Sequence, residues 1–219
     1  MTNVYILSLS YTNSTTSNFN PSETALSKTL DTIKGLAQLE VRTGYFGMCV
    51  RSHGILWLCS ADTNGLTEQI GPGNDPLNLI GAASKFKDDV LFSGLLFMAI
   101  VLSLISFCLL GTFPGWSEEA TGGSDVDVKP FPSRPVSQVA LSCAAVAAIL
   151  SLIAGLWQHV GSVGAAAMAE MANYGNVKAD IGTGAVAMGW AGVFITTMPA
   201  IGLFVMIMSI IVLDRLTDD

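Results

Sequence analysis

The stretch from residue 44 to residue 60 reads Gly44-Tyr45-Phe46-Gly47-Met48-Cys49-Val50-Arg51-Ser52-His53-Gly54-Ile55-Leu56-Trp57-Leu58-Cys59-Ser60. Two apolar runs flank a polar turn, which indicates a β-hairpin. If the chain reverses at Gly54, Cys49 and Cys59 lie opposite each other. Residues paired in this way are about 4.5–5.5 Å apart at Cα, within the roughly 4.4–6.8 Å that a disulfide spans. We therefore expect a Cys49–Cys59 disulfide, which requires an oxidising compartment.

Two alternatives for these cysteines stay open at this point. In the first, both thiols are reduced and act as apolar residues of a cytosolic strand. In the second, they bind a metal together with His53, although zinc sites of this kind use closer Cys-x-x-Cys spacing and a fourth ligand, and the stretch has neither. The sequence predicts no metal site, no cofactor and no catalytic residues.

The composition indicates a membrane protein. Of the 219 residues, 51% are hydrophobic and 12% are charged, whereas soluble domains carry about 25% charged residues. The net charge is −7, so the chain lacks the basic surface that nucleic-acid binding needs.

Three long apolar segments follow the hairpin, at residues 90–113, 136–157 and 181–213. Each contains at least the roughly 20 residues needed to cross the hydrocarbon core, so we expect three transmembrane helices in a lipid bilayer. Pro199 lies in the middle of the third and is expected to kink it.

Small residues recur in two of these segments. The second contains Ala140, Ala144 and Ala148, and the third contains Gly184, Gly189 and Gly192. Small side chains let helices approach closely in lipid, so we expect the second and third helices to be neighbours. A homodimer contact through the same residues is the alternative.

An oxidised hairpin places residues 1–89 outside the cell, as an extracellular loop domain. Three spans then make residues 114–135 a polar cytosolic loop, residues 158–180 a second extracellular loop and residues 214–219 a cytosolic tail. The tripeptide beginning at Asn13 is a glycosylation sequon. The distribution of basic residues argues the other way, because six of the ten lie in residues 1–89, but that rule is weak for long translocated domains.

Two further segments of this loop domain have recognisable patterns. Residues 4–9 are strand-like, and Leu26, Leu30, Ile33 and Ala37 follow helical spacing. Residues 1–30 contain no apolar core of 7–15 residues that would serve as a signal peptide. We therefore expect a membrane span upstream of Met1.

Acidic residues near the predicted outer ends of the spans are candidates for attracting cations. They are Asp88, Asp89, Glu170 and Asp180; the alternative is that they are ordinary solvated charges. The predicted spans contain no Asp, Glu, Lys or Arg, so a pore lined by charge within one subunit is not expected. The same absence argues against an intramembrane enzyme. Any role in ion entry would then involve a homo-oligomer or a separate channel as partner.

The hairpin motif and the order of the spans resemble the fungal calcium-regulator and membrane-fusion family, within the claudin superfamily. The signature of that family is a glycine, two hydrophobic residues, a glycine, any residue and a cysteine, then a spacer and a second cysteine. Here it reads Gly44-Tyr45-Phe46-Gly47-Met48-Cys49, followed by Cys59. Animal claudins place a tryptophan before the first cysteine, whereas Trp57 lies between the two, which favours the fungal family.

The resemblance implies a claudin-like transmembrane helical bundle with a small extracellular β-sheet that carries the disulfide hairpin. It also implies a plasma-membrane glycoprotein that promotes or regulates calcium influx and membrane fusion during fungal mating. The alternative is a claudin-like structural or adhesion protein that organises cell contact or membrane domains without moving ions.

Overall fold

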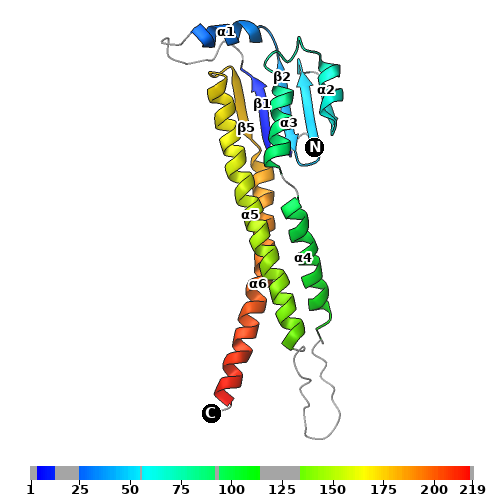
Figure 1. Cartoon of the computed structure of the whole chain (residues 1–219), viewed down its shortest axis with the longest axis vertical. Helices are drawn as coiled ribbons and strands as arrows, with labels where there is room; N and C mark the ends of the chain where they lie inside the picture. The colour runs from blue at the N-terminus through cyan, green and yellow to red at the C-terminus, as the bar shows by residue number, and fades with distance from the viewer. Residues whose placement is uncertain (1–3, 13–24, 55, 92–93, 114–133, 218–219) are drawn as a thin grey trace. The chain divides into compact units, whose positions relative to one another are not determined.

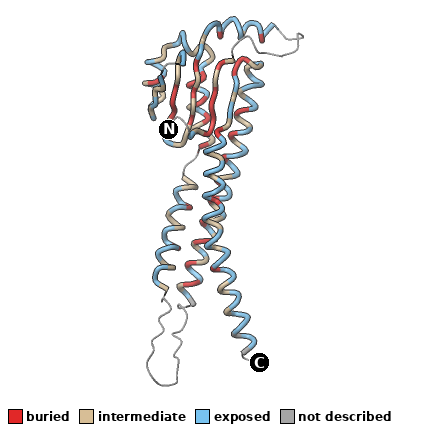
Figure 2. The backbone as a smooth tube through the Cα atoms, turned by 180° about the vertical axis from the view of Figure 1, so that it is seen from behind, coloured by how far each residue is buried: buried red, intermediate tan, exposed pale blue. Residues whose placement is uncertain are grey.

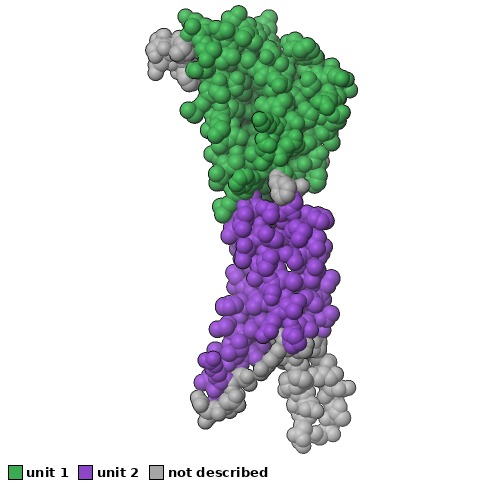
Figure 3. All heavy atoms as spheres, in the orientation of Figure 1, with its two compact units in different colours: residues 1–93, 155–189 green, residues 94–154, 190–219 purple. Residues whose placement is uncertain are grey.

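The computed structural model describes residues 4–12, 25–54, 56–91, 94–113 and 134–217 (Figure 1). In chain order its elements are β1 (Leu7–Tyr11), α1 (Ala25–Lys34), β2 (Leu39–Gly44), β3 (Gly47–Ser52), β4 (Leu56–Ser60), α2 (Thr63–Ile70), α3 (Leu79–Val90), α4 (Gly94–Gly111), α5 (Arg134–Ala172), β5 (Val177–Ile181) and α6 (Thr183–Thr217). They form two compact units (Figure 3). We call Met1–Ser93 with Gly155–Gly189 the sheet domain, and Gly94–Ala154 with Trp190–Asp219 the helical unit.

The sheet domain is built on one antiparallel sheet with the strand order β4-β3-β2-β1-β5. Polar and apolar residues alternate along β2, as expected for a strand with one buried face. Neighbours in sequence pair through short turns from β2 to β4. The fifth strand arrives from far along the chain, because β5 pairs with β1 in a register that sets Leu9 opposite Ala179.

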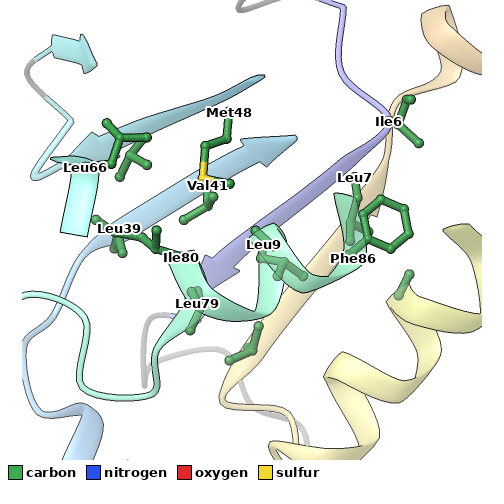
Figure 4. Packing of buried hydrophobic residues seen from close by; sticks show 14 of the residues in the cluster. Ile6, Leu7, Leu9, Leu39, Val41, Met48, Leu66, Leu79, Ile80 and Phe86 are labelled. Atoms are coloured by element: carbon green, nitrogen blue, oxygen red, sulfur yellow. The ribbon is translucent and has the colours of Figure 1, made fainter. Parts of the chain in front are cut away.

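One face of the sheet carries the hydrophobic core. Leu7, Leu9 and Val41 point toward α2 and α3, which cover this face (Figures 1 and 4), and Val50 belongs to the same buried cluster. The helices contribute Leu66 from α2 and Leu79, Ile80, Ala83 and Phe86 from α3, all of them buried. Each fully buried aliphatic side chain contributes about 1.5–3 kcal/mol, so this layer is the main stabilising feature of the sheet domain.

Helix α2 and all but the last residue of α3 lie within residues 1–89, where the sequence predicted only a loop domain with a short helix and the hairpin. Side chains satisfy their first N–H groups. Asp62 accepts from the backbone N–H of Asn64 and Gly65 at the start of α2, and Asp75 accepts from Leu79 and Ile80 at the start of α3, at 2.7 and 2.9 Å. These are the capping contacts that let short helices form.

Two predicted boundaries within residues 1–89 are corrected. The first helix ends at Lys34 instead of continuing to Ala37, because Gly35 adopts a left-handed φ of +54° that stops it. The first strand covers Leu7–Tyr11 instead of residues 4–9.

Three helices are long and apolar enough to cross a membrane: Gly94–Gly111, Pro135–Ala172 and Thr183–Leu213. The three predicted spans are thereby confirmed as helices, but their bounds change. The first begins at residue 94, not 90, because α3 ends at Val90 and the chain leaves helical geometry at Leu91. Residues 114–133 of the predicted cytosolic loop lie outside the described residues.

The prediction of a loop over residues 158–180 is wrong in its secondary structure. α5 continues to Ala172, and β5 begins at Val177. The alanine-rich run from residue 165 to 172 has high helix propensity, and β5 is stabilised by its distant partner β1.

The packing of α5 follows residue size. Its buried positions recur every three or four residues and, apart from Gln158, are all Ala or Ser: Ser137, Ala140, Ala144, Ala147, Ser151, Ala154, Gln158, Ser162 and Ala166. Bulky residues such as Ile149 and Leu152 are exposed, so the buried positions appear as isolated points along the helix (Figure 2). This distribution is typical of a helix that packs through small residues and faces lipid with large ones.

The predicted contact between the second and third spans is confirmed. Ala140 and Ala144 pack against Leu203 of α6, with Ala200 beside them, and Ser151 Oγ lies 2.8 Å from Thr196 Oγ1. Of the predicted glycines, Gly184 and Gly192 are exposed, whereas the Cβ position of Gly189 lies 3.9 Å from Gln158 Oε1 of α5. The small residues at this contact therefore come mainly from α5.

Candidate functional site

The β3–β4 hairpin contains the predicted disulfide. Cys49 and Cys59 are directly paired in the antiparallel register, with Cα atoms 4.0 Å apart, and their sulfurs are bonded. The chain reverses through His53 and Gly54, which adopt left-handed φ values of 51° and 73°. The hairpin and its disulfide are thus confirmed, and a disulfide is typical of an oxidising compartment.

The two motif glycines differ in their surroundings. A Cβ atom at Gly47 would lie 2.8 Å from the carbonyl oxygen of Ser60, too close for any side chain without a backbone shift. A Cβ atom at Gly44 would meet nothing closer than 3.9 Å. Gly47 is therefore needed for the close approach of β4, whereas Gly44 has room for a methyl group.

The face of the sheet opposite the core is polar and carries Trp57. The guanidinium of Arg42 lies 4.7 Å from the ring centroid of Tyr5 and 4.5 Å from that of Trp57. The guanidinium of Arg51 lies 4.9 Å from the same Trp57 ring. Cations at this distance from an aromatic face are attracted to its negative face. Trp57, half-buried, thus packs against two arginines on the polar face instead of in the core.

Glu40 joins the two arginines. Its Oε1 lies 2.8 Å from Arg42 Nε, and its Oε2 lies 2.5 Å from Arg51 Nη2. Glu40, Arg42 and Arg51 are not among the residues predicted from the sequence. The alternation of polar and apolar residues along Leu39–Gly44 is the signal that would have placed Glu40 and Arg42 on the outer face.

The turn between β2 and β3 presents the motif residues Tyr45 and Phe46. The Tyr45 hydroxyl donates a hydrogen bond to Gln158 Oε1 of α5, and burial raises the pKa of Tyr45. The Phe46 side chain is 78% exposed. The motif therefore attaches the sheet to α5 at one residue and exposes an aromatic ring at the next.

The four acidic residues proposed to attract cations fall into two pairs. Glu170 Oε1 accepts a hydrogen bond from the backbone N–H of Ala179 at 3.0 Å, and Asp180 pairs with Lys178 at 3.0 Å. Asp88 and Asp89 are exposed in the last turn of α3. Within the described part of the chain, no group of three or more His, Cys, Asp or Glu residues is arranged to hold a metal ion. Asn13, the predicted glycosylation site, lies outside the described residues.

A disulfide-containing antiparallel sheet, in one chain with apolar helices long enough to span a bilayer, defines an integral membrane protein that also has a folded sheet domain. Residues 25–209 match the family model described as "Ca2+ regulator and membrane fusion protein Fig1". The chain belongs to this family, and calcium regulation and membrane fusion are the processes that its description gives. No curated protein and no solved structure matches the chain, so the claudin-like relationship stays a prediction.

Proposed function

We propose that this chain is a plasma-membrane protein that promotes or regulates calcium influx and membrane fusion during fungal mating, with residues 1–89 outside the cell. The family match over residues 25–209 is the observation that carries the proposal. The Cys49–Cys59 disulfide supports the extracellular placement of the sheet domain, because such bonds persist in oxidising compartments.

The chemistry of the helices favours regulation over conduction by a single chain. Within the three candidate spans the one charged residue is Glu170, which is committed to the backbone of β5. Ion pathways through a membrane are usually marked by ionisable or other polar groups facing an aqueous cavity. We therefore propose a non-enzymatic protein that acts through a homo-oligomer or on a separate calcium channel.

The exposed residues Asp88 and Asp89 lie six and five residues before Gly94, where α4 begins. We propose that this pair raises the local concentration of cations next to the membrane. Glu170 and Asp180 are less available for that role because both already have partners.

The alternative function is adhesion or membrane organisation without ion movement. Its support is the polar face of the sheet, where Trp57, Arg42 and Arg51 lie together. Tryptophan and arginine are the residues most enriched among those that dominate protein–protein binding. A partner protein on this face would be consistent with a role in cell contact.

Pheromone-stimulated calcium uptake in mating cells that lack the protein separates the two functions. The proposal expects reduced uptake that the wild-type chain restores. A double variant Asp88→Asn/Asp89→Asn is expected to restore less, and Glu68→Gln, which neutralises one exposed carboxylate on α2, serves as the control. Surface levels are measured for every variant. Normal uptake together with defective cell contact would favour the adhesion function and contradict the proposal.

Glycosylation tests the placement of residues 1–89. We expect Asn13 to carry a glycan in a full-length chain, because it is an acceptor tripeptide on the side proposed to be extracellular. Glycosidase treatment should then increase the gel mobility of the wild type but not of Asn13→Gln. A band that glycosidase leaves unchanged would count against the extracellular placement.

A further inference from the structure

The turn that carries Phe46 is attached to α5 through Tyr45, so its level can be compared with the expected edge of the hydrocarbon core. The apolar stretch of α5 begins at Pro135, and about 20 residues cross the hydrocarbon core, so this edge falls near Ala154. The Tyr45 hydroxyl bonds to Gln158, four residues further along. At about 1.5 Å per residue, this contact lies about 6 Å from the expected edge.

Helix α6 gives the same level independently. Counting about 20 residues back from Leu213, where its apolar stretch ends, places the edge near Phe194. The Gln158 Oε1 atom lies 3.9 Å from the Cβ position of Gly189, which precedes Phe194 by five residues, or about 8 Å of helix. Both helices therefore place the Tyr45–Gln158 contact within about 8 Å of the expected edge of the hydrocarbon core.

Other apolar side chains at this level are also exposed. Val4, whose carbonyl oxygen is 3.9 Å from the Cβ position of Gly44, is 50% exposed, and Trp157 is 61% exposed. Tryptophan is enriched at the boundary between lipid and water. A phenylalanine that is 78% exposed at the tip of a turn buries little of its ring against the described residues, but it is favourable in the apolar part of a leaflet.

We propose that the Tyr45–Phe46 turn is a membrane-contacting loop, in which Phe46 inserts into the lipid leaflet next to the sheet domain while Tyr45 fixes the turn to α5. The occupant is the acyl-chain region of the same bilayer that the apolar helices are expected to cross. Within the motif, Gly47 and Cys49 then hold the hairpin together. Tyr45 and Phe46, between the two glycines, determine how deeply the turn enters the leaflet. The inference does not depend on which side of the membrane the sheet domain occupies.

The strand register provides a matched control at the far end of the same hairpin. Leu56 pairs with Ser52, and Ser52 pairs with Leu39, so Leu56 lies at the end of β3 remote from Phe46. Six residues of strand separate the two ends by about 20 Å. Leu56 is 75% exposed, so the two side chains are about equally accessible and differ in their distance from the Tyr45–Gln158 contact.

The test uses the full chain, reconstituted into phosphatidylcholine vesicles, with the free cysteines replaced as Cys108→Ala and Cys143→Ala. Phe46→Cys and Leu56→Cys are each labelled with an environment-sensitive fluorophore. Lipids that carry a nitroxide near the top of the acyl chain are then added. We expect the label at position 46 to emit at shorter wavelength and to be quenched at least twofold more than the label at position 56.

Equal quenching of the two labels, or the emission of a water-exposed fluorophore at position 46, would overturn the proposal. Such a result would leave Phe46 as a contact for a second copy or another protein. If a thiol at position 46 disturbs the disulfide, Val4→Cys provides a label at the same level without altering the turn. We expect the label at position 4 to be quenched at least twofold more than the label at position 56. Equal quenching of these two labels would likewise overturn the proposal.

Discussion

The hydroxyl group of Thr43 is buried in the core face of the sheet, with the residue 0% exposed, and no described residue makes a hydrogen bond to it. An unpaired buried hydroxyl costs about 1–3 kcal/mol. We therefore expect Thr43→Val, which keeps the shape and removes the hydroxyl, to raise the free energy of unfolding by about 1 kcal/mol. Thermal unfolding of the purified protein measures this change.

Val41→Thr is the matched control for this substitution. Val41 is also 0% exposed and lies two residues away on the same strand and face. Val41→Thr should lower the free energy of unfolding by about 1–3 kcal/mol, because it introduces the same unpaired hydroxyl group. If both variants shifted stability in the same direction, the Thr43 hydroxyl would have a partner in solution.

Tyr11 connects β1 to the start of α3 and makes the sheet domain sensitive to high pH. Its hydroxyl donates to Asp75 Oδ1 at 2.8 Å and accepts from the backbone N–H of Leu77 at 3.0 Å. Burial, followed by the hydrogen bond to Asp75, raises the pKa of Tyr11 above its usual value. A raised pKa means that the folded chain holds this proton more tightly than the unfolded chain does.

The stabilisation from Tyr11 should therefore be complete below about pH 10, the pKa of an unfolded tyrosine, and should be lost as the pH rises further. We expect the midpoint of thermal unfolding to fall above that pH. Tyr11→Phe should lower the midpoint at pH 7 and should show a smaller alkaline decline than the wild type. Part of the decline remains, because burial also raises the pKa of Tyr45. An identical alkaline decline in Tyr11→Phe would contradict this account.

At the scale of the element, the two glycines of the hairpin motif differ in how much space the β2–β3–β4 strands leave for a side chain. Gly47→Ala should destabilise the sheet domain by at least about 1 kcal/mol, because its Cβ would lie 2.8 Å from a backbone oxygen of β4 that cannot move freely. Gly44→Ala is the control, since its nearest neighbour is at 3.9 Å. Resistance to limited proteolysis and the surface level of each variant provide the measurements. Equal behaviour of the two alanine variants would show that the contact at Gly47 is relaxed in solution.

The hairpin could be predicted because its information is local. The spacing of Cys49 and Cys59 around Gly54 gives their pairing without any knowledge of the rest of the chain. Helices α2 and α3 were missed because they are short and depend on capping by Asp62 and Asp75 and on burial against the sheet. The contacts of Trp57 with Arg42 and Arg51 were likewise not predicted, because they join side chains from different strands of the sheet.

At the scale of the whole molecule, the number of apolar helices followed from their length and composition alone. The pairing of β1 with β5 did not, because it joins residues about 170 positions apart and leaves no periodic signal in sequence. The Tyr45–Gln158 hydrogen bond was hidden for the same reason. For α5, the sequence does indicate which positions are buried, because apart from Gln158 they are all small residues.

The small residues of α5 are therefore expected to set how closely the helices of the helical unit pack. Ala140 is 0% exposed, it packs against Leu203, and its carbonyl oxygen accepts a hydrogen bond from Ser106 Oγ of α4 at 3.0 Å. Ala140→Leu adds three carbon atoms where the three helices are in contact. Overpacking of this kind costs about 1–3 kcal/mol, so we expect a lower midpoint of thermal unfolding in detergent and in vesicles.

Val139→Leu enlarges the adjacent residue, which is 51% exposed, and should leave the midpoint unchanged because the added carbon meets lipid. The comparison isolates packing from hydrophobicity, since both substitutions make the helix more apolar. If Ala140→Leu were tolerated as well as Val139→Leu, small residues would not set the distance between α5 and its neighbours. Stability of the helical unit would then have to come from polar contacts such as the one between Ser151 and Thr196.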